Sequence, residues 1–324
     1  MQRTDRLTPQ PLPLPLETEQ GGQAGRTEQA GRTEQAGQRE QAGQREQRGR
    51  QDGGPPAVSL RGAALAYGDR LLWRDLDLDL RPGEFLAVLG PNGSGKTSLL
   101  RVLLGRQPLT TGSVAVLGRP PGRAGGLIGY VPQHKALPAH TLLRARDLVR
   151  LGLDGHRWGL PLARRAVRRR VDELLESVGA LPYADVPVGR LSGGEQQRVR
   201  VAQALATDPR VLLCDEPLLS LDPRHQRTVT ELVDRRRRAA GTAVVFVTHE
   251  INPVLGAADR VLYLAGGGFR VGPPEEVLTS AVLSRLYGTQ VDVVRVRGRI
   301  VVVGAPDAAA VPHHTARPDG AGPP

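Results

Sequence analysis

The chain has little of what secreted and membrane-spanning proteins hold in abundance. Its 324 residues include a single cysteine, Cys214, so an internal disulfide is impossible. No apolar run approaches the ~18–20 residues that a membrane-spanning helix needs. The N-terminus lacks a secretory apolar segment, because Leu12, Leu14 and Leu16 alternate with prolines. We therefore expect a cytoplasmic protein.

Aromatic residues and lysines are also scarce. Phe, Trp and Tyr make up 3% of the sequence, which argues against the stacking platforms of proteins that bind single-stranded nucleic acid. We accordingly expect no nucleic-acid partner. Lys96 and Lys135 are the only lysines, so arginine carries almost all of the positive charge behind the net charge of +11. A basic balance of this kind is compatible with acidic lipid or with an ordinary solvated surface.

Residues 1–56 are poor in the apolar side chains from which a core is built. A six-residue unit, QAGRTE and then QAGQRE, occurs four times in succession from Gln23. The segment holds eight arginines and eight acidic residues, so the net charge of +11 belongs to the rest of the chain. This composition predicts a disordered low-complexity tail over 1–56, with a tether for a partner as the alternative.

From residue 57 onward, apolar runs of strand length alternate with segments of helical periodicity. Runs such as 85–89, 211–214 and 243–247 are apolar throughout, as expected of strands that are buried on both faces. The alternation predicts an α/β fold with a mainly parallel, covered sheet. Strands are expected at 58–60, 64–67, 76–80, 85–89, 112–117, 127–131, 211–214, 243–247, 261–264 and 269–271. Helices are expected at 98–104, 195–206 and 228–240.

Residues 134–190 differ in character from the segments on either side. The stretches 142–151, 161–171 and 171–178 have helical spacing and many arginines, with glycines and prolines between them. We predict a small helical insertion between two halves of the α/β core. Its arginines are expected to form a solvated helix face rather than a binding site. They include Arg164, Arg165, Arg168, Arg169 and Arg170.

A glycine-rich loop stands between the strand-like run 85–89 and the helical run 98–104. The loop reads Gly90, Pro91, Asn92, Gly93, Ser94, Gly95, Lys96 and Thr97. Glycines let the backbone turn its N–H groups inward, and the following helix adds positive partial charge at its N-terminus. In this context the pattern predicts a phosphate-binding loop, with Lys96 on the β- and γ-phosphates and Thr97 on Mg²⁺. The alternative is a glycine turn with an exposed lysine.

Two carboxylates, Asp215 and Glu216, end the apolar run 211–214. In a protein with a phosphate loop, the first belongs with Mg²⁺, and the second can align or deprotonate an attacking water.

The stretch 191–195 has two interpretations. Ser192 and Glu195 fit a capping box at the start of a helix. A capping box does not explain Gly193 and Gly194, which weaken a helix but allow a backbone or a phosphate to approach its N-terminus closely.

Taken together, these motifs resemble those of the nucleotide-binding subunits of ATP-binding cassette (ABC) transporters. Motif order and identity match at 90–97, at Gln133 in Tyr130-Val131-Pro132-Gln133, at 191–195, at Asp215-Glu216, at Asp222 and at His249. The similarity covers about 57–280. It implies a RecA-like core with a phosphate loop and a mainly parallel sheet, an antiparallel β subdomain, and the helical insertion at about 134–190.

The resemblance also implies roles for residues that bind nucleotide. Tyr67, in Ala66-Tyr67-Gly68, matches the aromatic residue that stacks on adenine. Ser192, Gly193 and Gly194 match the signature that contacts the γ-phosphate of ATP bound to the other subunit. Asp222 matches a carboxylate that crosses the dimer. Members commonly read Ser-Ala-Leu-Asp there, whereas this chain reads Leu219-Ser220-Leu221-Asp222, so a hydrogen bond from a serine at 219 is lost.

The same resemblance implies a catalytic set and a cation site. Glu216 matches the general base, His249 the histidine near the γ-phosphate, and Gln133 the residue that touches Mg²⁺ and water. Thr97, Gln133 and Asp215 are then the candidate Mg²⁺ ligands. The implied cofactors are ATP and Mg²⁺. The implied partners are a second copy of the chain, a separate membrane permease and, indirectly, an external substrate-binding protein. The protein would then lie on the cytoplasmic face of the membrane.

The cargo is indicated by weaker similarities. The segments 128–133, 249–255 and 283–288, followed by strands expected at 291–296 and 299–303, resemble those of zinc and manganese importer ATPases. Siderophore importers have similar C-terminal segments, and a soluble ABC ATPase or a nucleotide-gated scaffold are further alternatives. We expect an ABC ATPase domain at 57–280, an extension with short strands at 281–304, and a flexible tail at 305–324.

Overall fold

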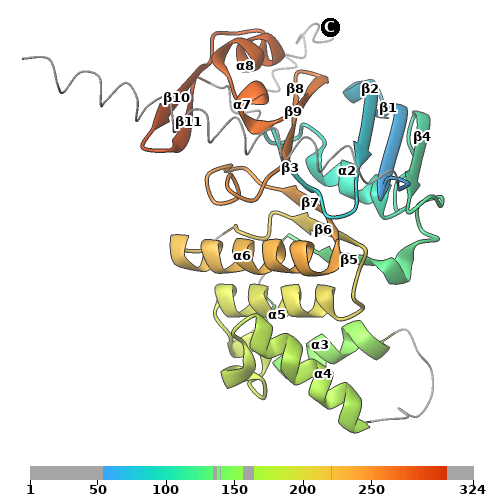
Figure 1. The fold of residues 1–324 in the computed structure, drawn as a ribbon, viewed down its shortest axis with the longest axis vertical. Coiled ribbons are helices and arrows are strands. Elements are labelled where there is room, and N and C mark those ends of the chain that lie inside the picture. Colours follow the sequence, from blue (N-terminus) through green and yellow to red (C-terminus); the bar gives the residue numbers. More distant parts are fainter. Residues whose placement is uncertain (1–53, 134–136, 139, 156–163, 220, 305–324) are drawn as a thin grey trace, which may run out of the picture. The chain divides into compact units, whose positions relative to one another are not determined.

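The computed structural model describes residues 54–133, 137–138, 140–155, 164–219 and 221–304 (Figure 1). Contacts divide the chain after Gly54, and the fold described below is that of the second unit, 55–324. Of the predicted N-terminal tail, residues 1–53 lie outside the described part, and so does the whole predicted tail 305–324. Among the described helices, none combines the length and the apolar character required to cross a bilayer.

A six-stranded sheet forms the centre of this unit, in the order β5-β6-β7-β3-β8-β9. The strands are β3 (Phe85–Leu89), β5 (Ile128–Val131), β6 (Val211–Asp215), β7 (Ala243–Val247), β8 (Arg260–Ala265) and β9 (Gly268–Gly272). All neighbours pair in parallel except β9, which is antiparallel to β8. The predicted mainly parallel sheet is therefore confirmed.

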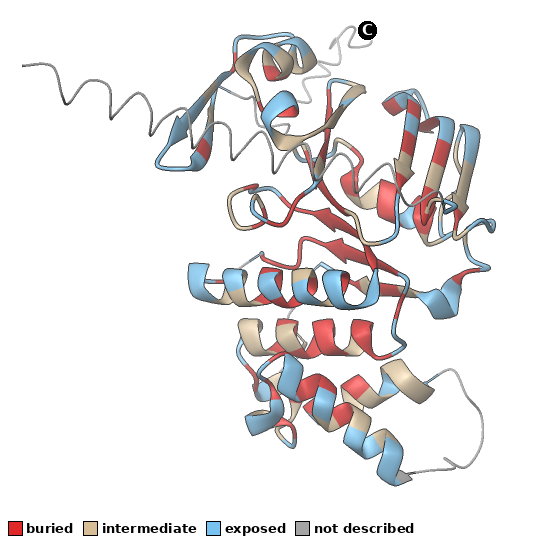
Figure 2. Ribbon diagram, viewed as in Figure 1, coloured by how far each residue is buried: buried red, intermediate tan, exposed pale blue. Residues whose placement is uncertain are grey.

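The central strands of this sheet are apolar throughout, and both faces of the sheet are covered. Every residue of β3, β6 and β7 is buried (Figure 2). Successive side chains along a strand point to opposite faces. Accordingly, Phe85, Ala87 and Leu89 join one apolar cluster, whereas Leu86 and Val88 join another. Strands that show no alternation in sequence thus contribute to two cores at once.

A second, antiparallel sheet has the order β2-β1-β4, with β1 (Val58–Tyr67), β2 (Arg70–Leu80) and β4 (Thr111–Val116). Leu76, Leu78 and Leu80 of β2 are buried while the acidic residues between them are not, as the alternation predicts. The two strand-like runs 58–60 and 64–67 form one strand rather than two. Its register shifts between Leu60 and Ala63, where Gly62 has a φ of 50°.

The main helices are α2 (Lys96–Leu103), α3 (Ala145–Asp154), α4 (Arg164–Ser177), α5 (Gly193–Leu205) and α6 (Pro223–Ala240). Helices α3 and α4 pack on α5, which contacts α6 (Figure 1). Two expectations need correction. Helix α4 is one helix across the two runs 161–171 and 171–178, and α6 begins five residues before the predicted 228. Asp222 explains the earlier start of α6, because its carboxylate caps the helix before a proline at the first position.

The chain continues through α7 (Pro274–Val277) and α8 (Ser280–Tyr287) to an antiparallel hairpin, β10 (Asp292–Val296) and β11 (Arg299–Val303). The hairpin agrees with the strands expected at 291–296 and 299–303. Four valines on its outer face are between 46% and 54% exposed. They are Val294, Val296, Val301 and Val303.

An ion-pair network joins the end of α6 to the start of β3. The Arg237 guanidinium is 9% exposed, and it donates to Asp259 at 2.5 Å and to the Gly83 carbonyl at 3.0 Å. Asp259 Oδ2 also accepts from the Phe85 backbone N–H at 2.8 Å. One carboxylate therefore satisfies a buried cation and the first N–H of a central strand.

We expect Asp259→Ala to lower the free energy of unfolding by about 1–3 kcal/mol, because it leaves a buried guanidinium and a strand N–H with fewer partners. The matched control is Asp154→Ala, which removes a partly exposed pair with Arg150 within α3. That change should cost less than about 0.5 kcal/mol. Urea denaturation followed by circular dichroism measures both, and equal losses would contradict the assigned role of Asp259.

Candidate functional site

The predicted phosphate loop turns directly out of β3 and into α2. Gly90 has a φ of 141°, and a Cβ there would lie 2.0 Å from the Leu264 carbonyl oxygen, so a larger residue does not fit. Gly93 and Gly95 have φ values of 75° and 97°, which side-chain-bearing residues rarely adopt. Gly95 is the N-cap of α2, and the loop therefore delivers its backbone to a helix N-terminus.

Lys96 and Ser94 give this loop its polar interior. The Lys96 ammonium is buried and donates to the carbonyls of Gly90 at 2.7 Å and Pro91 at 2.9 Å. Burial lowers the pKa of Lys96, and the carboxylates of Glu216 and Asp215 oppose that shift. Ser94 Oγ is buried and has no hydrogen-bond partner among the described residues. An unpartnered buried hydroxyl is costly, and the oxygens of a phosphate would supply the partner.

Asp215 forms an oxygen-rich corner next to the loop. Its two carboxylate oxygens accept from Thr97 Oγ1 at 3.0 Å and from the Tyr130 hydroxyl at 3.4 Å. Burial raises the pKa of Asp215, the bond from Thr97 lowers it, and the neighbouring Glu216 raises it further. A carboxylate and a hydroxyl held together are the hard oxygen ligands that Mg²⁺ prefers. Two of the three predicted cation ligands therefore meet here.

Glu216 lies at the centre of the site. Its side chain is 8% exposed, and its Oε1 lies 2.5 Å from His249 Nε2. Its other oxygen accepts from Gln133 Nε2 at 2.9 Å. The residue has a φ of 49°, a strained conformation for a side chain of this size, and its N–H donates to the Val247 carbonyl. The structure thus brings together the three predicted catalytic residues, with Gln133 turned to Glu216 rather than to Asp215.

Tyr67, at the end of β1, is 47% exposed. Its hydroxyl bonds to Gln107 Oε1 and lies 3.3 Å from Ser98 Oγ of α2, so the ring is tied to the helix that follows the loop. Sequence reasoning missed Arg70, which donates to the Gly93 carbonyl at 3.0 Å. No local pattern marks Arg70, because its partner Gly93 lies 23 positions further along the chain.

Ser192 and Asp222 occupy the N-termini of two helices. Ser192 and Glu195 form the capping box of α5, so that interpretation of the stretch is correct. Asp222 accepts from the N–H groups of Arg224 and His225 at 3.0 Å. Hydrogen bonds from the His225 backbone depress the pKa of Asp222 below its usual range. Among the described contacts, neither residue belongs to the cluster around Glu216.

The signature and the loop before α6 contact each other. A Cβ on Gly194 would lie 3.3 Å from Leu221 Cδ2, so this glycine allows the close approach of the two segments. Leu219, in the segment before Asp222, is 43% exposed. Ser220 lies outside the described residues.

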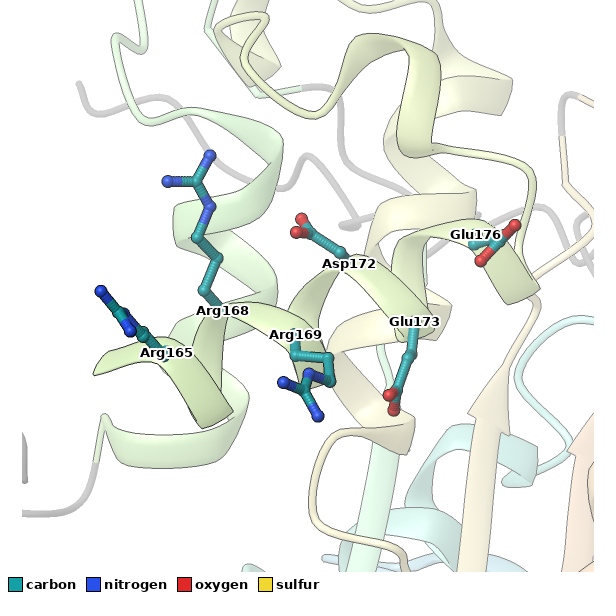
Figure 3. A pocket seen from close by; sticks show the side chains of 6 residues that line it. All are labelled: Arg165, Arg168, Arg169, Asp172, Glu173 and Glu176. Carbon is teal, nitrogen blue, oxygen red and sulfur yellow. The ribbon is translucent and has the colours of Figure 1, made fainter. Parts of the chain in front are cut away.

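A shallow hollow along α4 is lined by three of the five arginines singled out in the sequence. Its lining side chains are Arg165, Arg168, Arg169, Asp172, Glu173 and Glu176. Figure 3 shows them spreading from one helix in several directions, three basic and three acidic. Side chains of mixed charge on a single helix are typical of a solvated face, as expected.

Sequence comparison places this site among known proteins. The pattern of the ABC transporter family matches residues 73–219. Spermidine/putrescine import ATP-binding protein PotA 1 of Pseudomonas aeruginosa is 39% identical over 68% of this chain and 61% of that protein. Zinc import ATP-binding protein ZnuC of Halorhodospira halophila is 33% identical over 82% of this chain and 90% of that protein. The chain thus spans about three fifths of the first relative and nine tenths of the second.

Solved structures share the fold. One, described as a transporter of the metal-chelate type in an inward-facing conformation, has a TM-score of 0.65 at 28% identity and covers 76% of this chain and 96% of its own. The dimeric post-hydrolysis structure of the ATP-binding cassette MJ0796, bound to ADP and Pi, has a TM-score of 0.60 at 28% identity. The match covers 67% of this chain and 98% of that cassette. These similarities confirm the predicted α/β fold class.

Replacing Glu216 with Gln keeps the shape of the side chain and removes its charge. We expect Glu216→Gln to bind ATP normally and to lose roughly 10²–10⁴-fold in turnover, because a general base is lost.

Lys96→Ala should instead lose nucleotide binding itself, since a cation that contacts the phosphates is removed. Steady-state phosphate release and equilibrium binding of a fluorescent ATP analogue measure the two effects.

The matched control is Glu250→Gln, which neutralises an exposed carboxylate next to His249 and should keep wild-type turnover. If Glu216→Gln hydrolyses ATP at the wild-type rate, Glu216 is not the base and His249 becomes the better candidate.

Proposed function

The chain belongs to the ATP-binding cassette transporter family, as its motifs predict, and we propose that it is the ATP-hydrolysing subunit of an importer. The observation that carries this proposal is the carboxylate of Glu216, held between Gln133 and His249. The charge of that carboxylate also acts on Lys96 of the phosphate loop. A base, its orienting groups and a phosphate cradle therefore share one site.

Binding of ATP follows from the residues of the loop. Phosphate oxygens would take the place of the carbonyls that now accept from Lys96, and Ser94 would gain the partner it lacks. Tyr67 offers an exposed ring on which adenine can stack. Thr97 and Asp215, with Gln133 nearby, would hold Mg²⁺. When bound, Mg²⁺ would neutralise part of the charge on the phosphates.

Hydrolysis then depends on Glu216. A buried carboxylate fixed from two sides has little freedom, so it is oriented before water arrives. Glu216 accepts the proton of the attacking water, while His249 and Gln133 hold the carboxylate at the required angle. The strained backbone at Glu216, with its positive φ, is consistent with a carboxylate that must be held in a single orientation.

A second copy of the chain completes the site in this proposal. Ser192, Gly193 and Gly194 stand at the N-terminus of α5, where the helix dipole favours a phosphate. They lie apart from the cluster around Glu216 in their own chain, so their phosphate would belong to the partner. The dimeric state of MJ0796, a similar cassette, supports this arrangement. Asp222, beside Leu221 and the signature, would line the same interface.

A separate permease is the proposed membrane partner, and it would hold the protein on the cytoplasmic face. Leu142, which follows the Gln133 segment and precedes α3, is 80% exposed. A leucine exposed to that degree, in the helical region that follows Gln133, suits a docking contact. The mixed charges of α4 would border that contact. An external substrate-binding protein would deliver the cargo to the permease.

For the cargo we propose a divalent transition metal, zinc or manganese. The zinc import relative ZnuC matches over nine tenths of its length, whereas the polyamine relative PotA 1 matches over three fifths. The solved transporter of the metal-chelate type supports a metal-containing cargo in general. Import of an iron chelate is the second candidate, because similar C-terminal segments occur there, and a soluble ABC ATPase is the third.

Deleting the gene and measuring cellular zinc, manganese and iron under limitation tests the cargo. We expect zinc or manganese to fall, with rescue by the wild-type chain but not by Glu216→Gln. Unchanged zinc and manganese with lost uptake of a siderophore would move the assignment to iron chelates. Normal uptake of all three metals, together with intact ATPase activity, would favour a soluble ATPase.

A further inference from the structure

The C-terminal hairpin β10–β11 is held in place from two sides. A two-stranded sheet alone is only marginally stable in water, so its attachments decide where it lies. On one side, Ser284 of α8 donates to the Val291 carbonyl at 3.1 Å and accepts from the Val291 N–H at 2.9 Å. Ser280 accepts from the Val293 N–H at 2.8 Å. Helix α8 thus fixes the start of β10.

On the other side, the side chain of Asn252 binds β11. Its Nδ2 donates to the Ile300 carbonyl at 2.9 Å, and its Oδ1 accepts from the Ile300 N–H at 2.8 Å. Every second residue of an edge strand turns its backbone N–H and C=O groups away from the partner strand. The amide of Asn252 has one donor and one acceptor side, so it pairs with Ile300 as a neighbouring strand would.

Asn252 belongs to the loop that carries His249. That loop leaves β7 at Thr248, whose N–H donates to the Val88 carbonyl at 3.1 Å. Three residues after His249 comes Asn252, and next to it Ile251 is buried in the same apolar cluster as Ile300. The His249 side chain itself is 39% exposed, so its position depends mainly on the backbone of the loop.

We propose that Asn252 is a positioning residue, which fixes His249 against Glu216 by fastening the loop to the hairpin. The inference rests on the proposed role of His249 in ATP hydrolysis. A continuous path then runs from Ile300 through the Asn252 amide and three residues of backbone to the His249–Glu216 contact. The part of the extension that binds Asn252 therefore belongs to the catalytic architecture.

The test replaces Asn252 with Ala in the full chain, with Ser284→Ala as a matched control. Each change removes two hydrogen bonds to the backbone of one hairpin residue, but only the first touches the His249 loop. We expect Asn252→Ala to lower kcat about tenfold with KM for ATP unchanged, because a small displacement of a catalytic group is costly. Ser284→Ala should keep the wild-type kcat.

A double-mutant cycle with His249→Ala separates positioning from general destabilisation. If Asn252 acts through His249, adding Asn252→Ala to His249→Ala causes no further loss of kcat. Independent, multiplying losses would overturn the inference. So would wild-type kcat in Asn252→Ala when His249→Ala is strongly impaired, an outcome that leaves the proposed function intact.

Hydrogen exchange supplies a readout that does not need ATPase activity. Asn252→Ala should speed amide exchange in peptides covering 248–256, whereas Ser284→Ala should not. Equal exchange in the two variants would contradict the fastening role whatever the enzyme does. Wild-type turnover in His249→Ala would instead remove His249 from the proposed mechanism, and the exchange result would still report whether Asn252 holds the loop.

Discussion

The carboxylate of Glu216, bonded to Gln133 on one side and to His249 on the other, depends on the order of strands in the sheet. Gln133 follows β5, Glu216 follows β6 and His249 follows β7, and these three strands are neighbours. Carboxyl ends of parallel strands lie along one edge, so residues far apart in sequence meet there. The phosphate loop follows β3, the neighbour of β7, and takes the next place along that edge.

The same edge carries three groups in unfavourable surroundings or conformations. The strands beneath it are buried and apolar, and they stabilise the fold through burial. At their ends stand a buried lysine, a serine hydroxyl without a hydrogen-bond partner in the described part of the chain, and a glutamate with positive φ. Each of these costs stability locally, and each becomes useful when phosphates and water are bound. These groups thus lie where the proposed chemistry takes place.

Much of this was predictable from sequence, and the exceptions share a cause. The apolar runs and the loop 90–97 predict strand, turn and helix because those signals are local. Asp222 as the cap of α6 was missed because its place in the family motif suggested another role. The contact of Arg70 with Gly93 and that of Asn252 with Ile300 cannot be read from any pattern. They link residues 23 and 48 positions apart, and only the tertiary fold brings them together.

The central claim is that two adjacent carboxylates have separate tasks, Asp215 for the cation and Glu216 for water. Mn²⁺ can stand in for Mg²⁺ at oxygen-rich sites and is visible by electron paramagnetic resonance. With a non-hydrolysable ATP analogue, we expect Glu216→Gln to keep the spectrum of protein-bound Mn²⁺–nucleotide and Asp215→Asn to lose it. Loss of that spectrum in Glu216→Gln, or its retention in Asp215→Asn, would contradict the division of tasks.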